Sequence, residues 1–247
     1  MFMLTRRQWL WVAGLFLLTL IVRLPVRWVS ALLPAAAHCL EPSGTLWSGH
    51  CARAGSAPFA LADVSWTLQP WLLVTGRLGA EVRSGDPNAP LRAALRFGPG
   101  GRLEVRGLKG SVAIGSGLLP LFPEGWSGTL GLDVAAAELH AGKPQRIRGV
   151  LTVTGLRERG PGGELGSYEL RFDERAGGSG DIGGALRDTG GPLAVAARLL
   201  LDGNGAYELA GTVLARDSAS PDLAAAVAAL GAADAAGRRQ FSLAGSF

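Results

Sequence analysis

The stretches Gly44-Thr45-Leu46-Trp47-Ser48-Gly49 and Val64-Ser65-Trp66-Thr67-Leu68-Gln69-Pro70 indicate what kind of fold this chain adopts. In the second stretch, apolar and polar residues alternate from Val64 to Gln69, and Pro70 ends the run. A period of two is typical of a strand with one buried face, because successive side chains on a strand point to opposite faces. The stretch therefore predicts a β-strand whose apolar face carries a tryptophan.

The same alternation recurs along most of the chain. We expect further strands at 77–83, 91–97, 102–106, 130–134, 147–156, 168–172, 193–201, 207–213 and 241–247. The 37 glycines indicate many turns; Pro99-Gly100-Gly101 is a hairpin turn, and 160–163 and 177–191 are predicted turns or loops. Because successive strands have little between them, an antiparallel meander is favoured over βαβ units.

One helix is predicted near the C-terminus. Ser220 is a candidate N-cap, Pro221 suits the first helical position, and Gly231 can end the helix. Its apolar residues recur at helical spacing and should pack on the sheet: Leu223, Val227 and Leu230. The predicted fold is mainly β, with an N-terminal single transmembrane helix, an antiparallel curved β-meander forming an open or partly closed sheet, and one short C-terminal helix.

The N-terminal segment has the composition of a membrane anchor. Residues 9–22 carry no charge, and this apolar run extends to Val29 if Arg23 and Arg27 reach the membrane interface. We favour an anchor over a cleaved signal peptide, because a cleavage site at Ala35-Ala36-Ala37 lies far beyond the apolar run. We expect residues 1–33 to be the anchor with its flanks, and 34–247 a periplasmic β-rich domain with two similar strand sets meeting near 117–125.

Two cysteines, Cys39 and Cys51, bracket the first motif. In an oxidising compartment a disulfide between them would close a loop of about 13 residues and stabilise the fold by roughly 2 to 3 kcal/mol. Two free thiols, or a metal bound by the pairs His38-Cys39 and His50-Cys51, are the alternatives. We favour the disulfide, because neighbouring residues on a strand point to opposite faces and present two ligands to one ion poorly.

Composition and motifs argue against several functions. The net charge is +4, but the arginines are scattered along strand faces, so no nucleic-acid interface is predicted. The pattern G-x-G-x-x-G at 178–183 lacks the strand and helix of a dinucleotide site and is predicted to be a loop. The acids fall on polar strand faces beside arginines: Glu104, Asp133, Glu138, Glu164, Glu169 and Asp173. We predict no catalytic site, no metal site and no cofactor.

The two motifs together resemble the recurring signature of type II secretion system protein N. The positions that carry the resemblance are Gly44, Thr45, Leu46, Trp47, Ser48, Gly49, Val64, Trp66, Leu68 and Pro70. A weaker likeness covers 205–211. The resemblance implies a single-pass accessory subunit in the cell inner membrane, with most of its chain in the periplasm. Such a subunit would take part in the export of folded proteins through contacts with other secretion-system subunits.

A second hypothesis concerns lipid. Strands with one apolar and one charged face, behind a single anchor, also resemble AsmA-like proteins, whose curved sheets carry lipid along an apolar groove. With one predicted helix to cover the apolar side, the sheet must close on itself, pack on a second sheet, or hold an apolar ligand such as phospholipid. The alternative function is therefore a periplasmic lipid-binding or lipid-transfer module.

Overall fold

The computed structural model describes residues 39–56, 59–115, 124–160, 163–173, 181–203 and 205–246, together with residues 9, 11, 12, 14–16, 19, 20 and 23–26. Most of the predicted anchor and the segment 116–123 therefore lie outside the described residues. Among the residues that are described, no helix is both long enough and apolar enough to cross a membrane.

All of the strands belong to one antiparallel sheet. The strands are β1 (Cys39–Leu40), β2 (Ser43–Gly44), β3 (Ser48–Ser56), β4 (Phe59–Gln69), β5 (Leu78–Asp86), β6 (Ala89–Gly98), β7 (Arg102–Ile114), β8 (Trp126–His140), β9 (Lys143–Glu158), β10 (Gly163–Asp173), β11 (Ile182–Gly190), β12 (Leu193–Leu201), β13 (Ala206–Ala215) and β14 (Arg239–Ser246). From β3 to β14 each strand pairs with the next one in the sequence, and both β1 and β2 pair with β3. The predicted antiparallel meander is confirmed.

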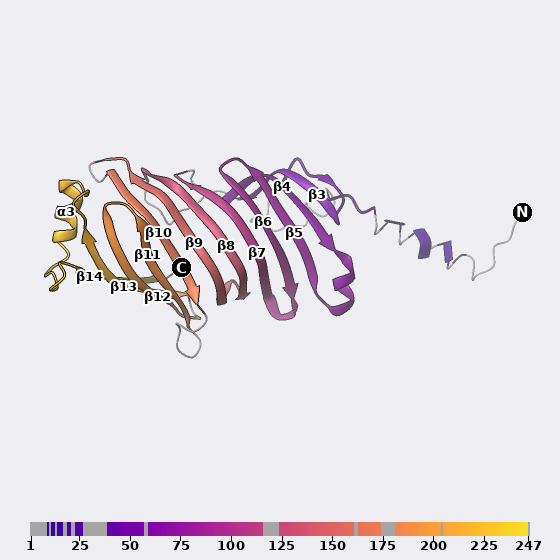
Figure 1. The fold of residues 1–247 in the computed structure, drawn as a ribbon. Coiled ribbons are helices and arrows are strands. Elements are labelled where there is room, and N and C mark those ends of the chain that lie inside the picture. Colours follow the sequence, from indigo (N-terminus) through magenta and orange to yellow (C-terminus); the bar gives the residue numbers. More distant parts are fainter. Residues whose placement is uncertain are drawn as a thin grey trace, which may run out of the picture.

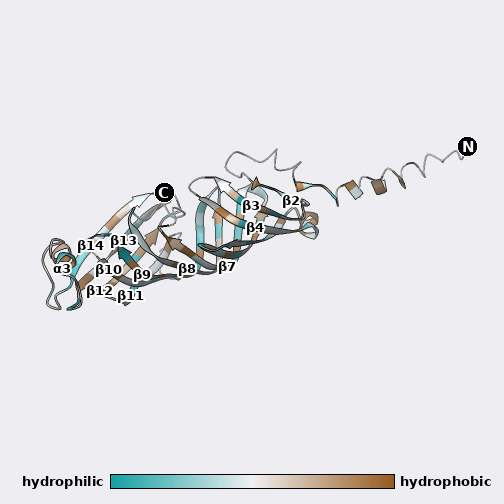
Figure 2. Cartoon of the chain, turned by 90° about the horizontal axis from the view of Figure 1, so that it is seen from above, coloured by the Kyte–Doolittle hydropathy of each residue, from teal (hydrophilic) through white to brown (hydrophobic). Residues whose placement is uncertain are grey.

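The sheet is long and curved. In Figure 1 the strands follow one another along the molecule, from β3 at the N-terminal end to β14 and the helix α3 (Pro221–Ala228) at the other end. Figure 2, seen from above, shows that this row of strands bends instead of lying flat. Several pairs contain register shifts, at Arg92/Ala94, Val134/Ala136 and Gly166/Tyr168 among others. Such irregularities bend and twist strands locally, so they favour curvature.

The pairing register places apolar side chains of successive strands opposite one another on one side of the sheet, which we call the apolar face. Its pairs include Trp66 with Val82, Leu95 with Val105, Leu103 with Leu139, Leu132 with Leu151, Leu151 with Leu170, Leu170 with Leu186, Leu199 with Leu209, and Leu209 with Leu243. The opposite side, which we call the charged face, pairs Arg96 with Glu104, Lys109 with Asp133, and Glu169 with Arg187. A period-2 sequence with a fixed register produces this separation.

The core lies on the apolar face in two clusters. One is built on Ile114, Leu156 and Leu165, and Leu223 of α3 packs against it. The other is built on Phe172, Ile182 and Leu201. Each cluster gathers side chains from at least four strands. The helix α3 thus covers part of the apolar face where the first cluster lies.

Two expectations about elements need correction. Residues 182–190, predicted as part of a loop, form strand β11, which pairs with β10 and β12. Glycines at 183 and 184 carry no apolar side chain, so they hid the alternation of this strand in the sequence. Pairing with β10 and β12 holds these residues in the sheet. The helix begins where predicted, with the Ser220 hydroxyl accepting from the Leu223 N–H at 3.2 Å, but it ends at Ala228 and leaves Leu230 exposed.

The proposed division into two strand sets stays a prediction. Strands β7 and β8 flank the segment 117–125 in the sequence and pair directly, from Arg102 opposite His140 to Ile114 opposite Gly128. The sheet therefore continues across this point. The other predicted strands are present, and the hairpin turn at Pro99–Gly101 is a short 3-10 turn between β6 and β7.

Candidate functional site

The first motif forms a tight turn between β2 and β3. The Thr45 N–H donates to the Ser48 carbonyl at 2.9 Å, and the Ser48 N–H donates to the Thr45 hydroxyl oxygen at 3.2 Å. Gly44 has a φ of +90°, and a Cβ at that position would lie 2.5 Å from the Ser48 carbonyl oxygen. Only glycine adopts this conformation without strain at such a close approach.

The second motif holds that turn in place. Trp66 lies directly opposite Gly49 in the β3–β4 register, and its indole N–H donates to the Leu46 carbonyl at 3.0 Å. A Cβ on Gly49 would collide with the indole ring. The Leu68 N–H donates to the Trp47 carbonyl at 2.6 Å. The two halves of the signature are therefore a large residue and the small residue that accommodates it, together with the hydrogen bonds that fix their turn.

The last residue of the second motif, Pro70, ends the strand. Pro70 begins a 3-10 helix, η2 (Pro70–Thr75), and Gly76 follows in the left-handed conformation with a φ of +68°. Leu72 of η2 lies so close to Gly79 that a side chain at Gly79 would collide with it. Pro70 thus begins a turn that lies against the start of β5.

The two cysteines form a disulfide, with their Cα atoms 5.6 Å apart. It joins β1 to β3, and Cys51 is almost fully buried. His50 lies on the opposite face, where its Nε2 is 2.6 Å from the carboxylate of Asp63. His38 lies outside the described residues, and among those described no group of three or more possible metal ligands was found.

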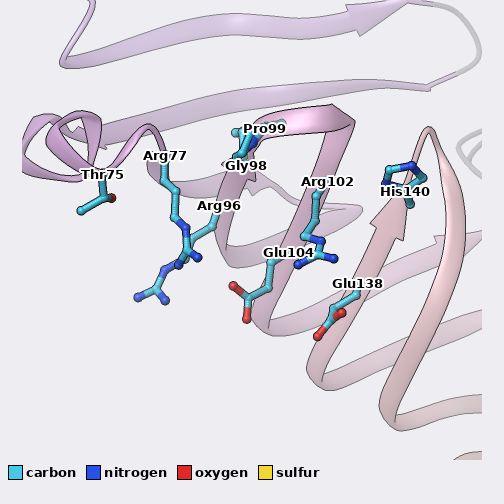
Figure 3. Close-up of a pocket in the computed structure, with 10 residues that line it drawn as sticks. Thr75, Arg77, Arg96, Gly98, Pro99, Arg102, Glu104, Glu138 and His140 are labelled. Carbon is cyan, nitrogen blue, oxygen red and sulfur yellow. The ribbon is translucent and has the colours of Figure 1, made fainter.

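A cleft of about 360 Å³ opens on the charged face near the ends of β5 to β8 (Figure 3). Its lining includes three arginines and two glutamates: Arg77, Arg96, Arg102, Glu104 and Glu138. Glu104 pairs with Arg106 at 2.5 Å, and Glu138 pairs with Arg146 at 3.5 Å. The two carboxylates are opposite each other in the register, but each has its own arginine. The cleft offers charge for binding a partner.

The other acids named from the sequence are spread over the charged face. Asp133 pairs with Lys109 at 3.3 Å, and Glu169 pairs with Arg171 at 3.2 Å. Glu164 and Asp173 lie on β10, both exposed. In the pattern at 178–183, residues 178–180 lie outside the described part, and Ile182 begins a strand where a dinucleotide site needs a helix.

One polar cluster was missed from the sequence. Asp188 lies on the apolar parity of β11, opposite Tyr168. Its carboxylate accepts from Arg216 at 2.5 Å and from the Val195 N–H at 2.9 Å. Arg216 also donates to the carbonyls of Gly191 and Leu193. A charged residue within an apolar alternation was the signal that could have found it.

This cluster alters two pKa values. Burial works to raise the pKa of Asp188, but the hydrogen bonds from Arg216 and the Val195 N–H outweigh it and lower the pKa below the ordinary value. Burial, with the charge of Asp188, raises the pKa of Tyr168 to about 12. The Tyr168 hydroxyl donates to the Leu165 carbonyl at 2.5 Å. These hydrogen bonds hold the ends of β11, β12 and β13 together.

Comparison with known protein families identifies a match over most of the chain. A family model described as Type II secretion system (T2SS), protein N, matches residues 35–242. That range includes both halves of the signature, so the family predicted from the signature is confirmed. Neither the curated proteins nor the solved structures contain a match to the chain. The likeness to AsmA-like proteins stays a prediction.

Proposed function

Because this chain belongs to the type II secretion system protein N family and is thus a secretion-system component, we propose that it is a non-enzymatic accessory subunit at the inner membrane. In this proposal residues 1–33 anchor the chain, and residues 34–247 lie in the periplasm. The subunit contributes to the export of folded proteins by contacting other secretion-system subunits.

The architecture carries this proposal. A single sheet with one charged face presents a long row of exposed ion pairs, such as Lys109 with Asp133 and Arg171 with Glu169. Exposed pairs of this kind add little to stability, but they give a partner a surface to recognise. An open sheet edge can also accept a strand from a partner through backbone hydrogen bonds. Both features suit contact between proteins.

The test is deletion of the gene in its native host. We expect a type II substrate to accumulate in the periplasm and to fall in the medium, and the full chain supplied in trans should restore secretion. A resident periplasmic enzyme serves as the control, because its location should not change. Unchanged secretion of every type II substrate in the deletion strain would contradict the proposal.

A second candidate function rests on the apolar face. Several large apolar side chains on this face remain well exposed, including Phe97 and Leu243. Among the described residues from β3 onward there is one α-helix, α3, and its Leu223 packs against the cluster of Ile114, Leu156 and Leu165. An apolar face of this length with so little described cover supports the binding of phospholipid acyl chains.

Native mass spectrometry of the purified chain, followed by organic extraction, tests the lipid hypothesis. Leu95 and Ala94 are neighbours on β6 that face opposite sides of the sheet and are both half-buried. We expect Leu95→Lys to lose co-purified phospholipid and Ala94→Lys to retain it. A protein free of lipid before any substitution would refute lipid binding and leave the secretion proposal untouched.

A further inference from the structure

The two edges of the sheet differ in how they are protected. At the N-terminal edge, β1 and β2 both pair with β3, and the disulfide fixes β1 to it. At the C-terminal edge, β14 pairs with β13, and Arg239 at its start forms an isolated bridge with Ala233. In the described part of the chain, no other strand lies beside β14. One edge is therefore covered, while the outward-pointing backbone groups of the other have no strand beside them in the part of the chain that the structure describes.

Strand β14 also lacks the features that normally prevent strands from pairing at an edge. After Arg239 it contains no charged residue and no proline, and it pairs with β13 without a register shift. Native edge strands are usually shortened, bulged, or marked by lysine or proline. An eight-residue edge without these features is a template for another strand.

Hydrogen bonds at the ends of the neighbouring strands show which groups of β14 point outward. Asp202 directly follows β12, and its N–H donates to the Ala206 carbonyl. The backbone N–H and C=O groups of Ala206 therefore point toward β12 and away from β14. Because the backbone N–H and C=O groups of successive strand residues point to alternate sides, those of Tyr207 point toward β14, where Tyr207 is opposite Gly245. The odd-numbered residues of β14 therefore bond to β13. The N–H and C=O groups of Ser242 and Ala244 point outward.

We propose that two copies of this chain pair through this edge, with β14 antiparallel to β14 and a two-fold axis at Leu243. In that register Ser242 of one copy is opposite Ala244 of the other, so the outward-pointing groups bond to each other. Leu243 is opposite its own copy in a non-hydrogen-bonded pair. Phe241 is opposite Gly245, which repeats the large-to-small pairing that β14 already makes with Tyr207 and Gly211 of β13.

The chemistry of the strand favours a second copy as the occupant. The apolar faces of the two sheets become continuous, and the side chain of Leu243, which is 56% exposed, becomes covered. The one charged residue, Arg239, lies at opposite ends of the paired strands, about 27 Å from its counterpart at 3.4 Å per residue. No like charges meet, and the contact is closed by its own symmetry.

Cysteine cross-linking of the full chain tests the register. The native cysteines are paired with each other, so a single new thiol reports on the contact. Leu243→Cys places two thiols across a non-hydrogen-bonded pair, where Cα atoms are about 4.5 Å apart and a disulfide can form. Ser242→Cys is the matched control, since it is exposed on the same strand but lies opposite Ala244 of the other copy.

We expect a covalent dimer from Leu243→Cys on mild oxidation, and several-fold less from Ser242→Cys. Equal cross-linking at the two positions, or none at either, would overturn the proposal. Stronger cross-linking at Ser242→Cys would move the axis and overturn the register.

A second measurement does not depend on thiols. Ser242→Pro removes an outward-pointing N–H, which the fold does not use, and puts a proline on the edge. Light scattering of the full chain in detergent should give a protein mass twice as large before the substitution as after it, with an unchanged circular dichroism spectrum. A monomer before substitution would overturn the proposal. This inference goes beyond the secretion role. Cross-linking and light scattering both measure self-association, so the dimer can be refuted while the secretion role stands, and the secretion role can be refuted while the dimer stands.

Discussion

At the scale of single residues, the signature is a set of steric matches. The indole of Trp66 occupies the space over Gly49 and bonds to the Leu46 carbonyl. Its partner must therefore lack a side chain, while the tryptophan must keep both its size and its N–H. The positions that carry the family resemblance are explained here by packing.

Gly49→Ala tests this match. The added methyl group would collide with the Trp66 ring, so we expect a loss of about 1 to 3 kcal/mol in the free energy of unfolding. Gly131→Ala is the control, because a Cβ there finds its nearest neighbour, the Thr152 carbonyl oxygen, at 3.6 Å. Urea unfolding of both variants should separate them. Similar losses would show that the cost comes from strand glycines in general.

Another residue-level feature is a row of like charges on the charged face. Arg92 is directly opposite Arg83 on one side and Lys109 on the other. Like charges in this position destabilise a sheet by about 0.2 to 1 kcal/mol for each pair. The row is therefore a local cost on the charged face.

Arg92→Glu should raise the melting temperature, because it converts both repulsions into attractions. Arg198→Glu is a matched control on the same face, since its neighbours across the strands are Ala185 and Ala210. We expect the control to change stability little. Thermal unfolding in low salt and again in 1 M salt checks the cause, because screening should reduce the gain. A gain that persists in high salt would contradict it.

At the scale of elements, the ends of the meander need separate devices because they have a neighbour on one side alone. The N-terminal end uses β1, β2 and the disulfide between Cys39 and Cys51. Two-residue strands hold few backbone bonds, so the covalent link is what keeps β1 on β3.

Cys39→Ser should therefore lower the free energy of unfolding by about 2 to 3 kcal/mol under oxidising conditions. Under reducing conditions the variant and the unaltered chain should converge, since neither then has the link. Calorimetry with and without a reductant measures both. An unchanged melting temperature under oxidising conditions would mean that the link does not stabilise the domain.

Near the C-terminal end, the ion pair between Asp188 and Arg216 ties β11 to β12 and to the end of β13. The pKa of Asp188 is lowered in the folded chain relative to its ordinary value of 3.8. A lowered folded pKa stabilises the protein fully above the ordinary value, and the contribution is lost as the pH falls through the folded pKa.

Asp188→Asn should therefore reduce stability near pH 7 and reduce the loss of stability on acidification below about pH 4. Asp133→Asn is the control, because that carboxylate is 62% exposed and pairs with Lys109 at the surface. Melting temperatures from pH 3 to pH 7 provide the comparison. The same acid dependence in all three proteins would exclude Asp188 as its source.

At the scale of the whole molecule, the strands from β3 to β14 are held by backbone pairing with their neighbours in the sequence. Each of β4 to β13 pairs with its two sequence neighbours, and the core clusters lie on one face. The described residues of the N-terminal segment contact this arrangement at the signature turn. There the Leu46 N–H donates to the Leu24 carbonyl at 2.9 Å, Pro25 pairs with Thr45, and Val26 is buried.

Two truncations test where the folded domain begins. Deleting residues 1–29 should leave a folded β domain, as the predicted boundary requires, but it also removes Leu24 and Val26 from the signature turn. Deleting residues 1–22 retains them, so this form should melt at a higher temperature. Circular dichroism and thermal unfolding measure both. A disordered spectrum for the shorter form would contradict the predicted boundary.

The sequence by itself determined the meander, because a period of two fixes which residues share a face wherever strand residues alternate cleanly. It also determined the cap of α3 at Ser220, which depends on local hydrogen bonds. It missed β11, since Gly183 and Gly184 carry no apolar side chain to mark the period. It missed the bond between Asp188 and Arg216 as well, because its partners are far apart in the chain.

The tertiary structure alone decided how the sheet ends and what its signature does. Alternation indicates that a residue lies on a face, but register decides which residue is opposite it, as for Gly49 and Trp66. Likewise, nothing local distinguishes a covered edge from an open one. The positions of β1, β2 and the disulfide cover β3, while among the described residues no strand lies beyond β14, because pairing between distant segments is a property of the assembled sheet.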